Sequence, residues 1–218
     1  MREAITVVSG IPRSGTSLMM GILEAAGLPL LRDGRRAPDP SNPRGYFELE
    51  AVKGTRRNAD WLQKAPGYAV KVIDSLLGDL PRDYAYRVIL MRRPIEAIIA
   101  SQNSMLARLG EPAAPIDDAR LGEILSAQLE ASRRLLDANA CFEWIEVDYP
   151  ALIRHPGPIL ERLGDFLGQA VDPEALAECI DPGLDHHFAP GNWRAHEGND
   201  DPKPDPDETS SPRIRPAR

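Results

Sequence analysis

The sequence predicts an α/β fold of three layers, in which a parallel sheet lies between helices on both of its faces. Short apolar runs rich in β-branched residues alternate with segments of helical periodicity, which is the pattern of strand–helix–strand units. The chain of 218 residues also suffices for one such domain with a sizeable core. We expect this domain to span residues 1–196. Residues 197–218, where proline, aspartate and serine dominate, are expected to form a disordered tail.

A glycine-rich turn joins the first predicted strand, residues 5–8, to the first predicted helix, residues 17–26. Two glycines separated by four residues precede a pair of hydroxyl residues, and glycine lets the backbone curl tightly around a bound group. The helix that follows offers free N–H groups and the positive end of its dipole. The turn is therefore expected to bind phosphate through Gly10, Arg13, Ser14, Gly15, Thr16 and Ser17.

This turn differs from the loop that binds nucleoside triphosphates. In that loop a lysine directly follows the second glycine and reaches the β- and γ-phosphates. Here Thr16 occupies the position, and the cation of the turn, Arg13, lies between the two glycines. The turn can hold a phosphate group, but it lacks the usual lysine for phosphoryl transfer.

The other elements follow from apolar patterns and from residues that begin helices. Pro94 suits the first position of a helix, because its ring fixes the backbone angle that a helix needs. Asp117 can cap a long helix whose apolar residues recur at helical spacing. In order, we expect a helix over residues 46–64, a strand over 68–73, a short helix over 76–80, a strand over 87–91, a helix over 95–109, the long helix after Asp117, a strand over 142–147, and helices over 156–167 and 173–180.

Charge and composition exclude several classes of partner. The net charge of -7 argues against nonspecific binding to nucleic acids or anionic membranes. No apolar run approaches transmembrane length, and no signal peptide precedes the first strand. Cys141 and Cys179 lack metal-type spacing, so we expect reduced thiols in a cytoplasmic protein. The adjacent His186 and His187 point apart and have no third ligand spaced with them, so no metal is expected.

Three polar clusters follow predicted strands. They are the turn around Arg13, the pair Arg92 and Arg93, and the pair Asp148 and Tyr149. In an open parallel sheet, ligands bind outside the carboxyl ends of the strands. We therefore expect the three clusters to form a single site at one edge of the sheet.

The turn over residues 10–17 resembles the 5′-phosphosulfate loop of the sulfotransferases. Residues 88–94, with Ser101 on the following helix, are similar to their 3′-phosphate element. Residues 147–149 resemble the segment whose tyrosine lies beside the nucleotide. The resemblance spans residues 4–170 and is closest to bacterial sulfotransferase-like proteins. It implies a fold like that of the P-loop NTPases, a sulfotransferase activity and the sulfuryl donor 3′-phosphoadenosine 5′-phosphosulfate (PAPS).

This donor carries two separated anionic ends, and the sequence has cations for each. Arg13 and the N–H groups of the turn suit one end, while Arg92 and Arg93 leave a strand where forked guanidinium groups can reach the other. Arg92 has the family's spacing to the proline, and which arginine binds the 3′-phosphate stays open. Ser101 lies one position beyond the family's serine, a rotation of about 100° on a helix. The alternative is that the tandem arginines are surface charge or pair with Glu96.

Sulfuryl transfer needs cations near the charge that develops on the leaving group and a base for the acceptor's proton. Arg13 is expected to stabilise charge. Lys71 resembles the family's lysine after the second strand, although a surface lysine at a strand end is equally compatible with the sequence. The cytosolic branch of the family has a histidine where this chain has Ile73. Other branches use a glutamate after the loop helix, so Glu48 is the candidate base, followed by Glu50; a glutamate favoured by a helix dipole is the alternative.

Two further segments bear on the ligands. Residues 32–45 are interpreted either as a lid over an anionic ligand, which shapes the choice of acceptor, or as a solvated connector. Residues 191–194 faintly resemble a C-terminal motif of the family, in which Trp193 would stack near the adenine. We expect a small-molecule, carbohydrate or lipid acceptor with a hydroxyl or an amine. No sequence feature selects among these acceptors or reports the oligomeric state.

Two other functions are compatible with the sequence. One is a P-loop kinase or NTPase, in which Asp148 holds magnesium at the end of an apolar strand, but the missing lysine beside Ser17 counts against it. The other is a noncatalytic nucleotide-binding protein of the same fold, which the absent histidine and the weak C-terminal motif support. A sulfotransferase is the function that the sequence favours most.

Overall fold

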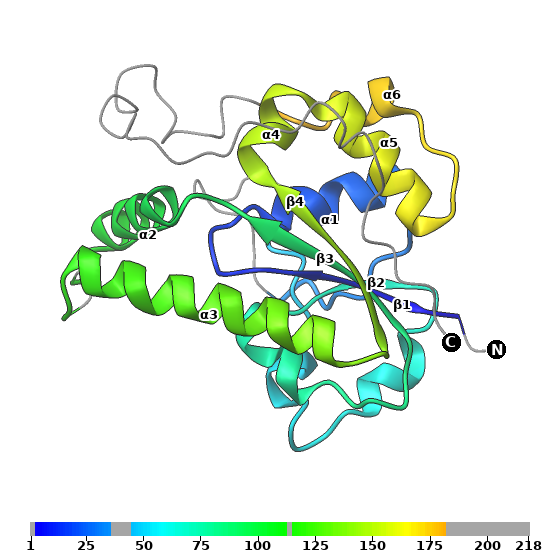
Figure 1. The fold of residues 1–218 in the computed structure, drawn as a ribbon, viewed down its shortest axis with the longest axis horizontal. Coiled ribbons are helices and arrows are strands. Elements are labelled where there is room, and N and C mark those ends of the chain that lie inside the picture. The colour runs from blue at the N-terminus through cyan, green and yellow to red at the C-terminus, as the bar shows by residue number, and fades with distance from the viewer. Residues whose placement is uncertain (1–2, 36–44, 113–114, 182–218) are drawn as a thin grey trace.

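A four-stranded parallel sheet forms the centre of the described part of the protein (Figure 1). The computed structural model describes residues 3–35, 45–112 and 115–181. The strands lie in the order β2-β1-β3-β4, so the first strand of the chain is in the interior of the sheet. Each neighbouring pair in this sheet is parallel. The strands are β1 (Ile5–Ser9), β2 (Ala69–Lys71), β3 (Tyr86–Arg92) and β4 (Phe142–Asp148).

Helices cover both faces of the sheet, which confirms the predicted fold class (Figure 1). One face packs against α1 (Thr16–Ala25), α4 (Tyr149–Arg154), α5 (Pro156–Leu167) and α6 (Pro173–Ala177). The other face packs against α2 (Ile95–Leu109), α3 (Asp118–Ala138) and the short 3-10 helices η1 (Glu50–Gly54), η2 (Asp60–Lys64) and η3 (Asp74–Asp79).

The central strands are buried on both faces, and this explains their nearly continuous apolar sequence. Side chains alternate between the faces along a strand. Val8 of β1 and Ile89 of β3 pack against the layer that contains α1. Val7 and Val88, their neighbours in the sequence, pack against the layer that contains α3. The carboxyl ends of the same strands carry the turn after β1 and the arginines after β3, so the sheet fixes where these polar groups lie.

The predicted helix over residues 46–64 is wrong, because this stretch forms η1 and η2 with irregular backbone between them. Phe47 has a φ of 51°, which a right-handed helix does not accommodate. Asn58 interrupts the rest of the segment, because its side-chain oxygen accepts the backbone N–H of Asp60 at 2.8 Å. Such side-chain bonds compete with a continuous helix.

The remaining element boundaries are close to the predicted ones. The helices α2 and α5 have the predicted bounds, while β2 and α6 are shorter than predicted. Asp117 caps α3 as expected, since its carboxylate accepts the backbone N–H of Arg120 at 2.8 Å. The sequence does not predict α4, whose six residues are too few to show a helical period.

Several predictions lie outside the described residues. The bounds of the domain and of its tail therefore stay predictions. Within the ranges that the structure describes, no helix combines the length and the apolar character that a membrane crossing requires. The predicted features outside those ranges are residues 36–44 of the lid, His186, His187, the segment 191–194 with Trp193, and the tail over residues 197–218.

Asp74 at the start of η3 is a buried carboxyl group, and its replacement by asparagine is expected to stabilise the fold at neutral pH. The side chain is 4% exposed and accepts a hydrogen bond from the Gln128 amide at 2.7 Å. Burial raises the pKa of Asp74 above its ordinary value, so the native state binds the proton more tightly than the unfolded chain does. The ionised carboxylate therefore costs stability at pH 7, and this cost disappears as the pH falls below the ordinary aspartate range.

We expect Asp74→Asn to raise the free energy of unfolding by about 1 kcal/mol at pH 7, because the asparagine oxygen still accepts from Gln128. The gain should shrink towards zero near pH 3, below the ordinary aspartate range. Urea unfolding at both pH values measures it, with the exposed Asp83→Asn as the matched control. An equal gain at the two pH values would show that ionisation of Asp74 is not the cause.

Candidate functional site

The glycine-rich turn, residues 10–15, joins β1 to α1, and Thr16 and Ser17 begin the helix; we keep the name phosphate turn for residues 10–17, which the sequence predicts to bind phosphate. Gly10 has a φ of 146°, in the region that side chains rarely adopt. A Cβ atom at this position would lie 2.5 Å from the Ser14 Oγ and 2.8 Å from the Met91 carbonyl oxygen. Only glycine therefore fits between the turn and β3. The turn ends where Thr16, which is buried, begins α1.

Gly15 is the second position where the turn requires a glycine. Its φ is 100°, and a Cβ atom there would lie 2.3 Å from the Cδ2 atom of Tyr149. Tyr149 directly follows β4, and it is 6% exposed. The tyrosine ring thus lies against the phosphate turn, which brings the end of β4 to the same site as the end of β1.

The contact between Gly15 and Tyr149 predicts a large stability loss for Gly15→Ala. Gly110 at the end of α2 is a matched control, since its φ of 69° is also left-handed but a Cβ atom there would meet nothing within 4 Å. Both alanines carry a backbone cost of about 1–2 kcal/mol. We expect Gly15→Ala to cost about 1–3 kcal/mol more, because the tyrosine ring must move. Urea unfolding compares the two variants, and equal losses would contradict this packing.

Arg13 connects the turn to α2. Its φ of 77° is unusual for a residue other than glycine, and such backbone strain concentrates at functional sites. The Arg13 Nε donates to the Oγ of Ser101 at 3.0 Å, and Ser101 is 3% exposed. The serine therefore faces the turn despite its one-residue offset from the family pattern. The backbone carbonyl of Arg13 accepts from the Nη1 of Arg93 at 3.1 Å.

The tandem arginines after β3 point in different directions. Arg93 is 7% exposed, and its guanidinium lies 4.7 Å from the centre of the Tyr149 ring. Arg92 is about half exposed and forms ion pairs with Glu146 and Asp148 on β4. The buried arginine thus faces the phosphate turn, whereas the exposed one is held by acidic side chains. We call Arg13, Arg93, Ser101 and Tyr149 the Arg13 cluster.

A second charged group forms around Lys71, the last residue of β2. Its Nζ donates to the Oγ of Ser17 at 3.2 Å and to the carbonyl of Tyr46 at 3.1 Å. The same nitrogen lies 4.0 Å from the Oε1 of Glu48, and the lysine side chain is only 9% exposed. Lys71 is therefore not a surface lysine. We call Lys71, Ser17, Tyr46 and Glu48 the Lys71 cluster.

The structure brings the predicted site residues together, with two exceptions. The Arg13 and Lys71 clusters are both attached to the phosphate turn, one through Arg13 and the other through Ser17. Glu50, the second candidate base, instead pairs with Lys53 at 2.7 Å. Arg92 is engaged by β4, as described above. Sequence reasoning missed the carbonyl of Tyr46, for which no signal exists because every residue carries a carbonyl group.

Two further observations concern metal chemistry. The described residues contain no group of three or more histidine, cysteine, aspartate or glutamate side chains that suits a metal ion. The carboxylate of Asp148 caps α4 by accepting the N–H of Ala151 at 2.8 Å, and it also binds Arg92. Both oxygens of this carboxylate are therefore engaged by protein groups.

Three solved structures have a fold similar to that of this chain. The sulfotransferase domain of the olefin synthase from Synechococcus PCC 7002 aligns with a TM-score of 0.52 and 17% identity, covering 84% of this chain and 87% of that domain. The sulfotransferase domain of the curacin biosynthetic pathway aligns with a TM-score of 0.50 and 16% identity, covering 82% of this chain and 78% of that domain. Mouse sulfotransferase SULT7A1, complexed with PAP, aligns with a TM-score of 0.53 and 14% identity, covering 83% of this chain and 64% of the mouse protein.

The chain has the sulfotransferase fold. No protein-family model matches the sequence, and no curated protein sequence matches it significantly. The similarity to sulfotransferases thus lies in the arrangement of the strands and helices. The sequences themselves are only 14–17% identical, so little sequence similarity remains beyond the short motifs. In this sulfotransferase fold, the Arg13 and Lys71 clusters lie at the carboxyl ends of β1, β2 and β3, the edge where open parallel sheets bind ligands.

Proposed function

We propose that the protein is a sulfotransferase that moves a sulfuryl group from PAPS to a hydroxyl or amine of an acceptor molecule. The observation that carries this proposal is the phosphate turn with a cationic cluster attached through Arg13 and another through Ser17. A donor with two separated anionic ends requires two such groups. The PAP bound in the mouse neighbour is adenosine 3′,5′-bisphosphate, the nucleotide that remains after PAPS gives up its sulfuryl group. In this proposal the enzyme works in the cytoplasm, where its cysteines stay reduced.

The turn has the features that a bound phosphosulfate group requires. The close approaches at Gly10 and Gly15 leave room only for backbone, so N–H groups can line the turn. Ser14 is 1% exposed, and its Oγ has no hydrogen-bond partner among the described residues. A buried hydroxyl group without a partner is costly unless a ligand oxygen satisfies it. We assign the 5′-phosphosulfate to this turn, with Ser17 and Lys71 beside it.

The Arg13 cluster suits the 3′-phosphate. Arg93 is favoured over Arg92, because Arg92 would first have to leave its ion pairs with Glu146 and Asp148. Arg13, which we assigned from the sequence to the other end of the donor and to charge stabilisation, bonds to Ser101, so we reassign its guanidinium to this cluster. Guanidinium groups bind phosphate oxygens in a forked geometry. Tyr149, the fourth member of this cluster, packs against Arg93 and the turn and so helps to hold the Arg93 guanidinium in place.

Glu48 and Lys71 are the groups that we assign to chemistry. An acceptor hydroxyl forms the new bond to sulfur while the bond between sulfur and the bridging oxygen of the donor breaks. Glu48 accepts the proton that leaves the hydroxyl group, and the ammonium group of Lys71 stabilises the negative charge left on the nucleotide. The distance of 4.0 Å between the Lys71 Nζ and the Glu48 Oε1 supports this assignment, because the two reactions need a carboxylate and a cation close together.

The competing functions receive less support. A kinase or NTPase needs a magnesium ligand, but Asp148 caps α4 and binds Arg92. Thr16 also replaces the lysine that reaches the β- and γ-phosphates. Nucleotide binding alone does not require a carboxylate beside a buried lysine at the turn, whereas sulfuryl transfer needs both a base and a cation. The Lys71 cluster therefore favours a catalyst.

Ser101→Ala tests the assignment of the 3′-phosphate to the Arg13 cluster. We expect this variant to bind adenosine 3′,5′-bisphosphate about tenfold more weakly, since a hydrogen bond to a charged group is lost. Its affinity for adenosine 5′-phosphate, which has no 3′-phosphate, should not change. Isothermal titration calorimetry measures both, with Ser104→Ala on the same helix as the control. Equal weakening for the two nucleotides would refute the assignment, and absence of bisphosphate binding by the unmodified protein would contradict the proposed function.

A further inference from the structure

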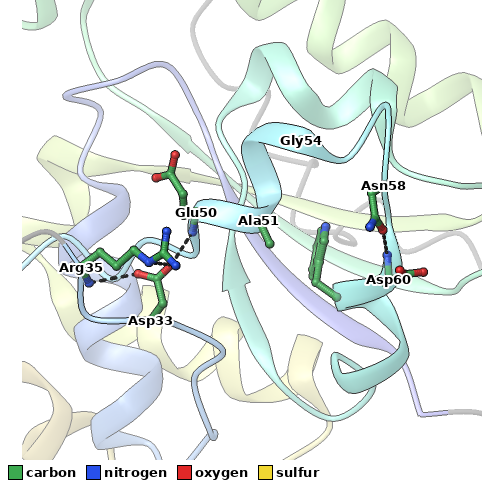
Figure 2. A pocket seen from close by; sticks show the side chains of 8 residues that line it. Asp33, Arg35, Glu50, Ala51, Gly54, Asn58 and Asp60 are labelled. Carbon is green, nitrogen blue, oxygen red and sulfur yellow. Dashed lines mark hydrogen bonds and ion pairs between the residues drawn. The ribbon is translucent and has the colours of Figure 1, made fainter.

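A pocket of about 460 Å³ lies beside the segment that carries Glu48 (Figure 2). Its volume is within the range of sites for small molecules. Figure 2 shows Asp33, Arg35 and Glu50 at one end of the pocket and Asn58 and Asp60 at the other. The residues that line it are Asp33, Arg35, Glu50, Ala51, Gly54, Asn58, Asp60 and Trp61.

Backbone contacts connect the pocket to the candidate base. The N–H of Asp33 donates to the carbonyl of Glu48 at 3.2 Å, and the Oδ2 of Asp33 accepts the N–H of Glu50 at 2.7 Å. Glu48 and Glu50 are two residues apart, which corresponds to roughly 7 Å of extended chain. The backbone of Glu48 therefore lies next to the end of the pocket that Asp33 and Glu50 line.

Most charges around the pocket are already paired. The carboxylate of Asp33 accepts the backbone N–H groups of Glu50 and Arg35 and lies 3.8 Å from the Arg35 guanidinium. The hydrogen bond from Glu50, followed by the one from Arg35, holds the pKa of Asp33 below its ordinary value. Glu50 pairs with Lys53. Asp60 is different, because it forms no ion pair with any other residue in the described part of the chain. Its side chain has one long contact, 3.5 Å from the Gln63 amide.

The aromatic wall of the pocket, formed by Trp61, favours a cationic ligand group, as the Asp60 carboxylate does. The indole N–H of Trp61 donates to the Oγ1 of Thr55 at 3.0 Å, and the residue is 8% exposed. The polar edge of the ring is thus bonded inside the protein, so the part that lines the pocket is aromatic surface without a donor. Such surface and a neighbouring carboxylate both attract an organic cation. An anionic ligand would instead meet three carboxylates and one guanidinium that is already engaged.

We propose that this pocket binds the acceptor, and that the acceptor is a small alcohol carrying an ammonium group. The ammonium group lies at Asp60 and Trp61, and the hydroxyl group extends towards Glu48. The inference rests on the proposed function, because it treats the pocket as the acceptor site of a sulfotransferase. The product is the sulfate ester of the amino alcohol; the hydroxyl proton goes to Glu48, and adenosine 3′,5′-bisphosphate leaves.

A matched pair of probes tests the proposal. 6-Amino-1-hexanol and 1-hexanol share the six-carbon chain and the hydroxyl group and differ in the ammonium group; the chain is long enough to separate the two polar groups across the pocket. We expect the amino alcohol to bind about tenfold more tightly than the neutral alcohol, measured by ligand-detected NMR titration with saturating adenosine 3′,5′-bisphosphate. Asp60→Asn should bring the two affinities together, while Asp83→Asn should preserve the difference. Both aspartates are exposed, so neither replacement threatens the fold.

Two outcomes would overturn the proposal: equal affinities for the two alcohols in the unmodified protein, or a preference that persists in Asp60→Asn. Binding of the bisphosphate is measured separately in the same samples, and its absence would count against the proposed function instead. In that case a preference that depends on Asp60 would still assign an amine site to the pocket, without a role in transfer. The two failures are therefore distinguishable.

Discussion

Replacement of Glu48 by glutamine is expected to lower kcat for sulfuryl transfer by about 10²–10⁴-fold, the usual contribution of a general base. Glutamine has nearly the same shape but cannot accept the proton of the acceptor. The carbonyl of Glu48 still accepts from Asp33, and Lys71 keeps its bonds to Ser17 and Tyr46. We therefore expect the Kd for adenosine 3′,5′-bisphosphate to stay within about twofold of the unmodified value.

Single-turnover transfer assays and calorimetry together measure this separation between chemistry and binding. Glu111→Gln, at an exposed position just after α2, provides the control, because it makes the same chemical change away from the site. Full activity of Glu48→Gln would remove Glu48 from the chemistry. Loss of bisphosphate binding in this variant would show that Glu48 shapes the donor site rather than acting on the acceptor.

Replacement of Lys71 by methionine is expected to lower kcat by about 10²–10³-fold, as for other groups that stabilise developing charge. Methionine keeps much of the apolar stem but removes the ammonium group that contacts Ser17, Tyr46 and Glu48. The effect falls mainly on kcat, because the negative charge on the leaving nucleotide grows as the bond to sulfur breaks.

Lys71→Arg should recover part of the activity, since it restores a cation in the same place. Lys64→Met at the exposed end of η2 is the matched control. Thermal denaturation of each variant shows whether it is folded at the assay temperature. Retention of more than half of the activity by folded Lys71→Met would mean that the lysine serves the structure alone.

The fold was predictable because its signals are local and strong. The apolar runs of β1 and β3 are buried on both faces, and the turn after β1 needs glycines at two close approaches. Asp117 and the periodic apolar residues behind it define α3. The stretch between α1 and β2 was the main failure, because the positive φ of Phe47 and the side-chain bond of Asn58 interrupt it, and periodicity reports neither.

The sequence predicts which residues form the site, but not how they bond to one another. The sequence indicates that Arg13, Ser101 and Lys71 belong to one edge of the sheet, yet their hydrogen bonds depend on packing between distant segments. The different directions of Arg92 and Arg93 show this most clearly. In the sequence the two arginines look equivalent, because both follow the same strand. In the structure, acidic residues on β4 pair with Arg92, whereas Arg93 packs against the Tyr149 ring.

Thermal denaturation with nucleotides tests the central claim most directly. Adenosine 3′,5′-bisphosphate at 100 times its Kd contributes about 2.7 kcal/mol, which corresponds to a rise in Tm of about 5–10 °C for a chain of this size. The proposed sulfotransferase function predicts this rise with the bisphosphate and none with ATP and magnesium. A rise with ATP and magnesium, without one for the bisphosphate, would contradict it.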